Sequence, residues 1–180
     1  MVKACIGLGS NLGDRRKNIL QAWSRLGENK WIDPLALSSP YESEPVGMES
    51  TSWFINAVGS FLTSLQPREL LTEMLKVEAS LGRKRSQDSC FEDRTIDLDL
   101  LYWDEMISND LDLILPHPEI ARRLFVLVPL VEIEPDLLHP VSKKSSVEML
   151  HQLLATHPPN KTASLIQKTS WCSSELRCST

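Results

Sequence analysis

The sequence lacks the features that mark several large classes of protein. It has only four cysteines, without C-x-x-C zinc spacing or the density of a disulfide framework, so we expect reduced thiols. It has no run of about 18 apolar residues and no signal-peptide pattern after Met1, which predicts a cytoplasmic protein that does not enter a membrane. Its net charge of −5 argues against a broad basic surface, so we expect no nucleic-acid partner.

Two common nucleotide-binding fingerprints are also missing. The chain contains no Gly-Lys-Ser or Gly-Lys-Thr, which excludes a Walker A loop. Residues 7–13 read GLGSNLG, but Leu12 stands where the dinucleotide fingerprint requires its third glycine. A dinucleotide-dependent oxidoreductase on a doubly wound sheet is therefore disfavoured. Any ATP site must bind the phosphates without either of these two motifs.

The size and composition are those of one ordinary domain. Of the 180 residues, 42% are hydrophobic, which is enough for a substantial core. We expect this domain to cover residues 1–158 and to be a monomer or a weak homodimer. Residues 159–180 are rich in Ser, Thr and Lys, and we expect them to form a loosely attached tail.

The order of the expected elements predicts the fold class. Apolar patterning and capping signals predict strands over residues 2–8, 35–41, 53–62 and 95–103, and helices that begin after Asp14, at Pro67 and after Ser145. This β-α-β-β-α-β order favours an α+β fold of the ferredoxin-like type. We expect an antiparallel sheet with helices packed on both sides, a three-layer α/β/α sandwich.

The most informative segment is residues 95–103, TIDLDLLYW. Alternate side chains of a strand share a face, so Asp97 and Asp99 lie on one face and the apolar residues between them on the other. Two neighbouring carboxylates repel each other, and their hard oxygen atoms suit Mg²⁺, which often combines them with substrate phosphates. The same alternation is also typical of any half-solvated antiparallel strand, so the pattern alone leaves both interpretations open.

A cluster of basic residues precedes the acidic strand: Arg83, Lys84, Arg85 and Arg94. Arginine binds phosphate oxygens in a bidentate manner, so a basic loop beside a carboxylate pair matches the needs of a Mg²⁺-polyphosphate. The loop by itself could equally be a solvated charged segment. Together, the two features favour phosphoryl chemistry.

Four blocks of the sequence resemble, in order, the 6-hydroxymethyl-7,8-dihydropterin pyrophosphokinases of folate synthesis: residues 9–14 (GSNLGD), 94–100 (RTIDLDL), 116–118 (PHP) and 123–130 (RLFVLVPL). The similarity extends from about Lys3 to about Leu154. The family has a ferredoxin-like α+β fold, in agreement with the order of elements above. The resemblance implies an enzyme that transfers pyrophosphate from ATP to the hydroxymethyl group of a reduced pterin and leaves AMP.

The resemblance also implies roles for individual residues at the phosphate end of the site. Asp97 and Asp99 would hold two Mg²⁺ ions that bridge the ATP phosphates. Arg83 and Arg94 would belong to a mobile catalytic loop that closes over the triphosphate. Three further positions match residues that approach the nucleotide: Glu78, His117 and Arg123. Without the resemblance, a histidine between two prolines could equally be a satisfied surface residue.

For the pterin, the resemblance implies a site made of side chains and loop backbone. Asn56 would hydrogen-bond the amide edge of the pterin, and Phe54 and Phe125 would enclose its ring between them. The other matching positions would border the ring: Ser43, Val46 and Phe91. In the absence of the resemblance, core packing would be the simpler explanation for each phenylalanine.

The chain departs from the family pattern just before Arg94. The family usually has a small residue and then a proline there, whereas residues 90–93 read Cys-Phe-Glu-Asp. Glu92 and Asp93 would weaken the attraction for phosphate or pair with Arg94.

The alternative function is a non-catalytic ferredoxin-like module that binds nucleotides or nucleic acid. The acidic net charge and the carboxylate pair argue against it.

Overall fold

A six-stranded antiparallel sheet is the central feature of the computed structural model, which describes residues 1–47, 50–83, 93–156 and 166–172. The strands of this sheet are β1 (Val2–Ser10), β2 (Ile32–Leu37), β3 (Tyr41–Ser43), β4 (Phe54–Thr63), β5 (Asp97–Trp103) and β8 (Ile166–Lys168). Their spatial order is β5-β1-β4-β3-β8, and β2 also pairs with β4. The two longest strands, β1 and β4, are paired at the centre over the full length of β1.

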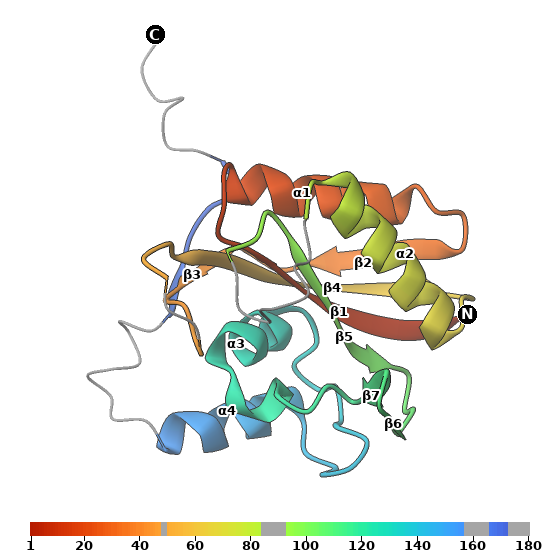
Figure 1. Cartoon of the computed structure of the whole chain (residues 1–180). Helices are drawn as coiled ribbons and strands as arrows, with labels where there is room; N and C mark the ends of the chain where they lie inside the picture. Colours follow the sequence, from red (N-terminus) through yellow and green to blue (C-terminus); the bar gives the residue numbers. More distant parts are fainter. Residues whose placement is uncertain (48–49, 84–92, 157–165, 173–180) are drawn as a thin grey trace, which may run out of the picture.

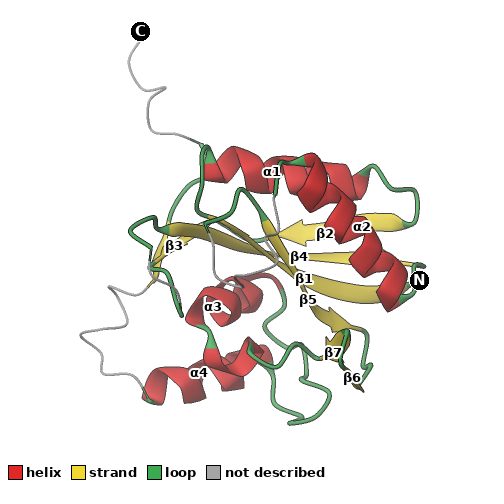
Figure 2. Ribbon diagram, viewed as in Figure 1, coloured by secondary structure: helices red, strands yellow, loops and turns green. Residues whose placement is uncertain are grey.

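Helices cover both faces of this sheet (Figures 1 and 2). One face carries α1 (Arg15–Gly27) and α2 (Pro67–Ser80); on the other, α3 (Leu124–Ile133) lies against the sheet and α4 (Ser146–Ala155) packs beside it. A separate hairpin of β6 (Ser108–Asp110) and β7 (Leu113–Leu115) and a short 3₁₀ helix, η1 (Ile120–Arg122), complete the fold. The expected three-layer α+β sandwich is confirmed. Across the described ranges, no helix combines the length and the apolar character needed to cross a bilayer.

The starts of the helices agree with the sequence signals. The Asp14 carboxylate accepts a hydrogen bond from the Lys17 backbone N–H at 3.1 Å and caps α1. Pro67 occupies the first turn of α2, where its missing N–H costs nothing. Ser145 and Glu148 form a capping box at α4, in which each side chain accepts from the backbone N–H of the other. These caps satisfy N–H groups that have no partner within the helix.

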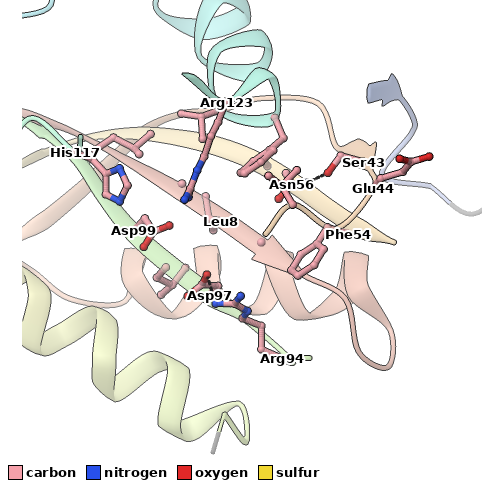
Figure 3. Close-up of a pocket in the computed structure, with 18 of the residues that line it drawn as sticks. Leu8, Ser43, Glu44, Phe54, Asn56, Arg94, Asp97, Asp99, His117 and Arg123 are labelled. Carbon is pink, nitrogen blue, oxygen red and sulfur yellow. Dashed lines mark hydrogen bonds and ion pairs between the residues drawn. The ribbon is translucent and has the colours of Figure 1, made fainter. Parts of the chain in front are cut away.

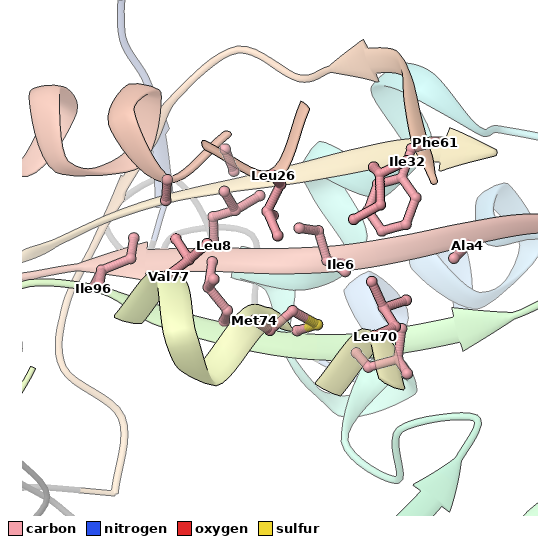
Figure 4. Close-up of a cluster of buried hydrophobic side chains, with 14 of the residues drawn as sticks. Ala4, Ile6, Leu8, Leu26, Ile32, Phe61, Leu70, Met74, Val77 and Ile96 are labelled. Carbon is pink, nitrogen blue, oxygen red and sulfur yellow. The ribbon is translucent and has the colours of Figure 1, made fainter. Parts of the chain in front are cut away.

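The main hydrophobic core lies between the sheet and the α1/α2 layer (Figure 4). Alternate residues of β1 point into it, among them Ile6 and Leu8, and they meet Leu70 and Met74 of α2. All four side chains are at most 2% exposed. Burial of each contributes about 1.5–3 kcal/mol relative to exposure, so this core fixes β1 and β5 as a rigid platform for the polar residues at their ends.

The expected single strand over residues 35–41 is wrong, because the structure divides it into β2 and β3. Leu37 is opposite Gly59 of β4, whereas Tyr41 is opposite Asn56. Residues 38–40 therefore insert one extra residue relative to β4, and such an insertion interrupts the hydrogen-bonding ladder. Pro40 adds to the interruption because it has no backbone N–H.

The expectation of a loosely attached tail is also wrong for the part of it that the structure describes. β8 pairs with β3 as an additional edge strand, and the Thr169 N–H donates to the Pro40 carbonyl at 2.8 Å. The Trp171 indole N–H donates to the Ser38 carbonyl at 3.2 Å. The free edge of a strand offers unpaired backbone groups, and another strand can pair with them whatever its side chains are. The amino-acid composition of residues 159–180 therefore did not predict this strand.

Gly59 tests the close packing of α1 on the sheet. A Cβ atom at this position would lie 2.3 Å from the ring of Trp23, which itself packs on Phe61 with ring centroids 6.3 Å apart. We expect Gly59→Ala to lower the free energy of unfolding by about 1–3 kcal/mol, measured by urea denaturation. Gly7→Ala is the matched control, because its added Cβ would lie at an ordinary contact distance of 3.7 Å from the Leu101 side chain. Equal losses in the two variants would contradict the steric explanation.

Candidate active site

A cavity of about 380 Å³ opens where the ends of β1, β4 and β5 meet the start of α3 (Figure 3). With two exceptions, every site residue that the sequence predicts lies in its wall: Ser43, Val46, Phe54, Asn56, Arg83, Arg94, Asp97, Asp99, His117, Arg123 and Phe125. One exception, Phe91, lies outside the described residues. The other, Glu78, lies behind the wall and is treated below.

The carboxylate pair occupies β5 as the strand geometry predicts. Asp97 and Asp99 both face the cavity, while Leu98 between them is buried. Burial and the repulsion of Asp97 raise the pKa of Asp99 to about 6, against the smaller opposing effects of Arg123 and Arg94. At neutral pH, the Asp99 carboxylate is therefore mostly ionised, but at a cost.

Two arginines contact the same carboxylate. Arg83 Nη1 forms an ion pair with Asp97 Oδ1, and Arg94 Nη1 donates to Asp97 Oδ2 at 2.8 Å. Arg94 also lies over the face of Phe54, with its guanidinium carbon 5.8 Å from the ring centroid. Among the described residues, its buried Nε has no hydrogen-bond partner. Figure 3 shows Arg94 beside Asp97 at the lower edge of the cavity.

Glu78 lies behind this cluster rather than in the cavity wall. The residue is 2% exposed, and its carboxylate accepts from the Leu98 backbone N–H at 2.8 Å and pairs with Arg83. This arrangement does not favour the predicted approach of Glu78 to a nucleotide, because the Glu78 carboxylate already binds the Leu98 N–H and Arg83. Glu78 instead ties the end of α2 to β5 and orients Arg83.

The role of Asn11 was missed at the sequence level. Asn11 is 4% exposed at the end of β1, and its side chain accepts from the Arg94 backbone N–H at 2.7 Å and donates to Asp93 at 2.5 Å. Its own N–H donates to the Arg94 carbonyl at 3.1 Å. The available signal was a polar residue directly after a strand, within the GSNLGD block. Asp93 thus binds Asn11, and Glu92 lies outside the described residues.

The opposite wall of the cavity is built around a buried amide. The Asn56 side-chain amide donates to the Ser43 hydroxyl oxygen at 2.9 Å, which fixes the orientation of the amide (Figure 3). A Cβ atom at Gly9 would lie 3.2 Å from Asn56 Oδ1, so a glycine leaves room for this amide. Phe54 and Phe125 supply the aromatic surface of the wall.

His117 lies in the cavity wall and is not a surface histidine. Burial lowers its pKa, and the positive charge of Arg123 lowers it further, so the ring is neutral at pH 7. The Glu119 backbone N–H donates to His117 Nδ1 at 3.2 Å. In a neutral ring the hydrogen then resides on Nε2, which makes this atom a donor.

The cavity therefore has two chemically distinct parts. One part places two carboxylates among three arginines, which suits a polyphosphate with its metal ions. The other part combines an oriented amide with aromatic side chains, which suits a flat heterocycle with polar edges.

The raised pKa of Asp99 predicts a pH-dependent effect on stability. In the folded protein the ionisation of Asp99 is unfavourable, so stability is lost as the pH rises from the ordinary value near 3.8 through about 6. In metal-free buffer, Asp99→Asn should raise the free energy of unfolding on the order of 2 kcal/mol at about pH 8, and the gain should fall towards zero near pH 4. Denaturation at both pH values measures this, with the exposed Asp112→Asn as control. A gain independent of pH would contradict the assignment.

Comparison with known proteins identifies the family. The model of the 7,8-dihydro-6-hydroxymethylpterin-pyrophosphokinase family matches residues 5–135. A 2-amino-4-hydroxy-6-hydroxymethyldihydropteridine pyrophosphokinase of Aquifex aeolicus is 43% identical over 145 residues, which cover 80% of this chain and 88% of the relative. The protein of the same name from Bacillus subtilis is 42% identical over 130 residues, with coverage of 72% and 77%.

Longer proteins contain a similar region. The folic acid synthesis protein fol1 of Pneumocystis carinii is 41% identical over 149 residues, which cover 83% of this chain but only 20% of that protein. The solved wild-type HPPK-DHPS of Plasmodium falciparum with STZ-DHP shares the fold, with a TM-score of 0.73 at 12% identity over 93% of this chain and 46% of that one. The chain thus spans a fifth of the first protein and under half of the second.

The match to the family model and the similarity to the Aquifex aeolicus and Bacillus subtilis proteins show the family of this chain. It belongs to the 7,8-dihydro-6-hydroxymethylpterin-pyrophosphokinases, the enzymes that transfer pyrophosphate to hydroxymethyldihydropterin in folate biosynthesis.

Proposed function

We propose that the cavity is the active site at which this chain transfers pyrophosphate from ATP to the hydroxymethyl oxygen of 6-hydroxymethyl-7,8-dihydropterin. The observation that carries the proposal is the carboxylate pair of Asp97 and Asp99, which lies among three arginines and opposite the Asn56–Ser43 wall. A metal–polyphosphate fits the first part and a pterin fits the second. The transferable group would lie between them.

Asp97 and Asp99 are the residues that would hold two Mg²⁺ ions. Carboxylate oxygens are the ligands that this hard cation prefers, and the repulsion between the two aspartates favours a cation beside them. Within the described part of the chain, no three His, Cys, Asp or Glu side chains converge on a metal position, so phosphate and water would complete the coordination. Bound Mg²⁺ neutralises negative charge on the phosphates.

Arg83 and Arg94 would exchange one anionic partner for another. Both guanidinium groups contact Asp97, and phosphate oxygens are equivalent acceptors with higher charge. Binding of a nucleotide would draw the arginines towards the phosphates and free the Asp97 carboxylate. The Arg94 guanidinium would then act on the charge that develops during transfer.

Arg123 and His117 would contact the nucleotide from the start of α3. Arg123 supplies a positive charge close enough to lower the pKa of both Asp99 and His117. Neutral His117 supplies the Nε2 hydrogen as a donor without adding charge. Glu78 would act through Arg83, whose side chain it orients.

The pterin would occupy the other part of the cavity. Asn56, held by Ser43, would pair with the amide edge of the ring, and Phe54 and Phe125 would contact its faces. Val46, 63% exposed at the cavity rim, would cover it. Phe91 stays a prediction as the contact from the arginine-bearing loop.

The alternative, a nucleotide-binding module without catalysis, predicts binding but no AMP. The decisive test is the double variant Asp97→Asn, Asp99→Asn. It retains the side-chain shapes but removes the charges that a divalent cation requires, so AMP formation from ATP and hydroxymethyl-dihydropterin should fall by on the order of a thousandfold or more. Thermal unfolding should show a folded protein, because the double change removes the repulsion between the carboxylates together with the ion pairs of Asp97 to Arg83 and Arg94. Wild-type turnover by this variant would refute the metal site, and absence of AMP with the parent chain would refute the proposed function.

Arg94→Ala separates transition-state stabilisation from nucleotide binding. We expect kcat to fall by about a hundredfold or more, with a much smaller change in KM for ATP, because the guanidinium acts mainly on charge that develops during transfer. Steady-state kinetics with both substrates varied measures the two constants. Arg122→Ala is the control, because that side chain is 77% exposed and pairs only weakly with Glu119 at 3.3 Å. A raised KM with unchanged kcat would make Arg94 a ground-state binding residue.

A further inference from the structure

The C-terminal strand β8 lies against the outer edge of the strand that carries Ser43. β3 has only three residues, and both of its edges are paired: Ser43 is opposite Phe54 of β4 on one side and opposite Ile166 of β8 on the other. Figure 1 shows β8, in blue, alongside β3. The backbone position of Ser43 therefore depends on both neighbours.

Side chains anchor β8 to other parts of the same wall. Lys168 Nζ lies 3.3 Å from Glu132 of α3 and 5.9 Å from the ring centroid of Tyr41. The Tyr41 hydroxyl donates to the other oxygen of Glu132 at 2.7 Å. Trp171 bonds the Ser38 carbonyl just before β3. β8 thus joins β3 to α3, the helix that begins beside the cavity.

This strand lies outside residues 5–135, the part of the chain that the family model matches. Without it, β3 would be a three-residue edge strand with a row of unpaired backbone groups. A strand of three residues forms few ladder hydrogen bonds with one neighbour, so pairing on its second edge adds a large share of the total. The Asn56–Ser43 hydrogen bond, buried at 2.9 Å, would then depend on a strand with little support.

We propose that β8 is a positioning element for the pterin subsite. It holds β3 so that Ser43 keeps Asn56 in the orientation that pairs with the heterocycle. The inference rests on the proposed function, since it assigns β8 to the pterin part of that cavity.

The effect should be confined to the pterin because the phosphate part is held by other contacts. Glu78 fixes the start of β5 through the Leu98 N–H, and Asn11 fixes Arg94 through its backbone. Neither contact involves β3 or β8. Loss of β8 should therefore change the affinity for the pterin and leave the affinity for the nucleotide and the chemical step unaltered.

Proline substitutions in the full-length chain test this directly. The Thr169 N–H points to β3, and N–H groups alternate along a strand, so that of Gln167 points the same way. The double variant Gln167→Pro, Thr169→Pro removes both donors. The matched control is Gln167→Val, Thr169→Val, which retains both backbone donors and favours a strand. Like the proline variant, it lacks the Thr169 hydroxyl that donates to the Pro40 carbonyl at 3.2 Å, so that loss is common to both.

Steady-state kinetics should show that the proline variant has a KM for the pterin raised by about fivefold or more, with kcat and KM for ATP within about twofold of the parent. The valine control should match the parent in all three constants. Hydrogen–deuterium exchange of residues 41–43, compared with that of β1, should be faster only in the proline variant. This second measurement requires no activity.

Three results would overturn the inference: an unchanged KM for the pterin, an equal loss in kcat and both KM values, or exchange in β3 as slow as in the parent. The first two results, which are kinetic, can be interpreted only if the parent chain is active. A parent that forms no AMP would refute the proposed function instead, and the exchange experiment would then still decide whether β8 holds β3.

Discussion

The repulsion between Asp97 and Asp99 is the constraint around which this end of the molecule is organised. Two carboxylates on one face of a strand, partly removed from water, are unfavourable unless positive charge lies close to them. The protein supplies that charge through Arg83 and Arg94 on one side and Arg123 on the other. Burial and the repulsion of Asp97 nevertheless raise the pKa of Asp99 to about 6.

Two buried polar residues hold these charged side chains in place. Glu78 and Asn11 are almost fully buried, yet neither lies in the cavity wall; each binds the backbone or side chain of a charged residue that does. Burying such polar groups is tolerable only because each is hydrogen-bonded. The apolar core between the sheet and the α1/α2 layer provides the stability that offsets this concentration of like charge.

Much of the fold was predictable because the signals are local. The caps at Asp14 and Ser145, the proline at the start of α2 and the alternation in β5 each involve residues a few positions apart, and all are confirmed. The two wrong predictions concern pairing between strands. The interruption between β2 and β3 is a matter of register against β4, and β8 is recognised only by its place beside β3.

The sequence by itself determined that Asp97 and Asp99 share a face, because side-chain direction in a strand has a period of two. It also determined the family through the order of its blocks. Only the tertiary structure decided that Arg83 and Arg94 meet on one carboxylate and that Asn11, 82 residues away from Asp93, anchors the strand that follows the arginine-bearing loop. The reason is that periodicity and capping are properties of neighbouring residues, whereas neutralisation of charge and completion of a sheet edge depend on which distant segments the core brings together.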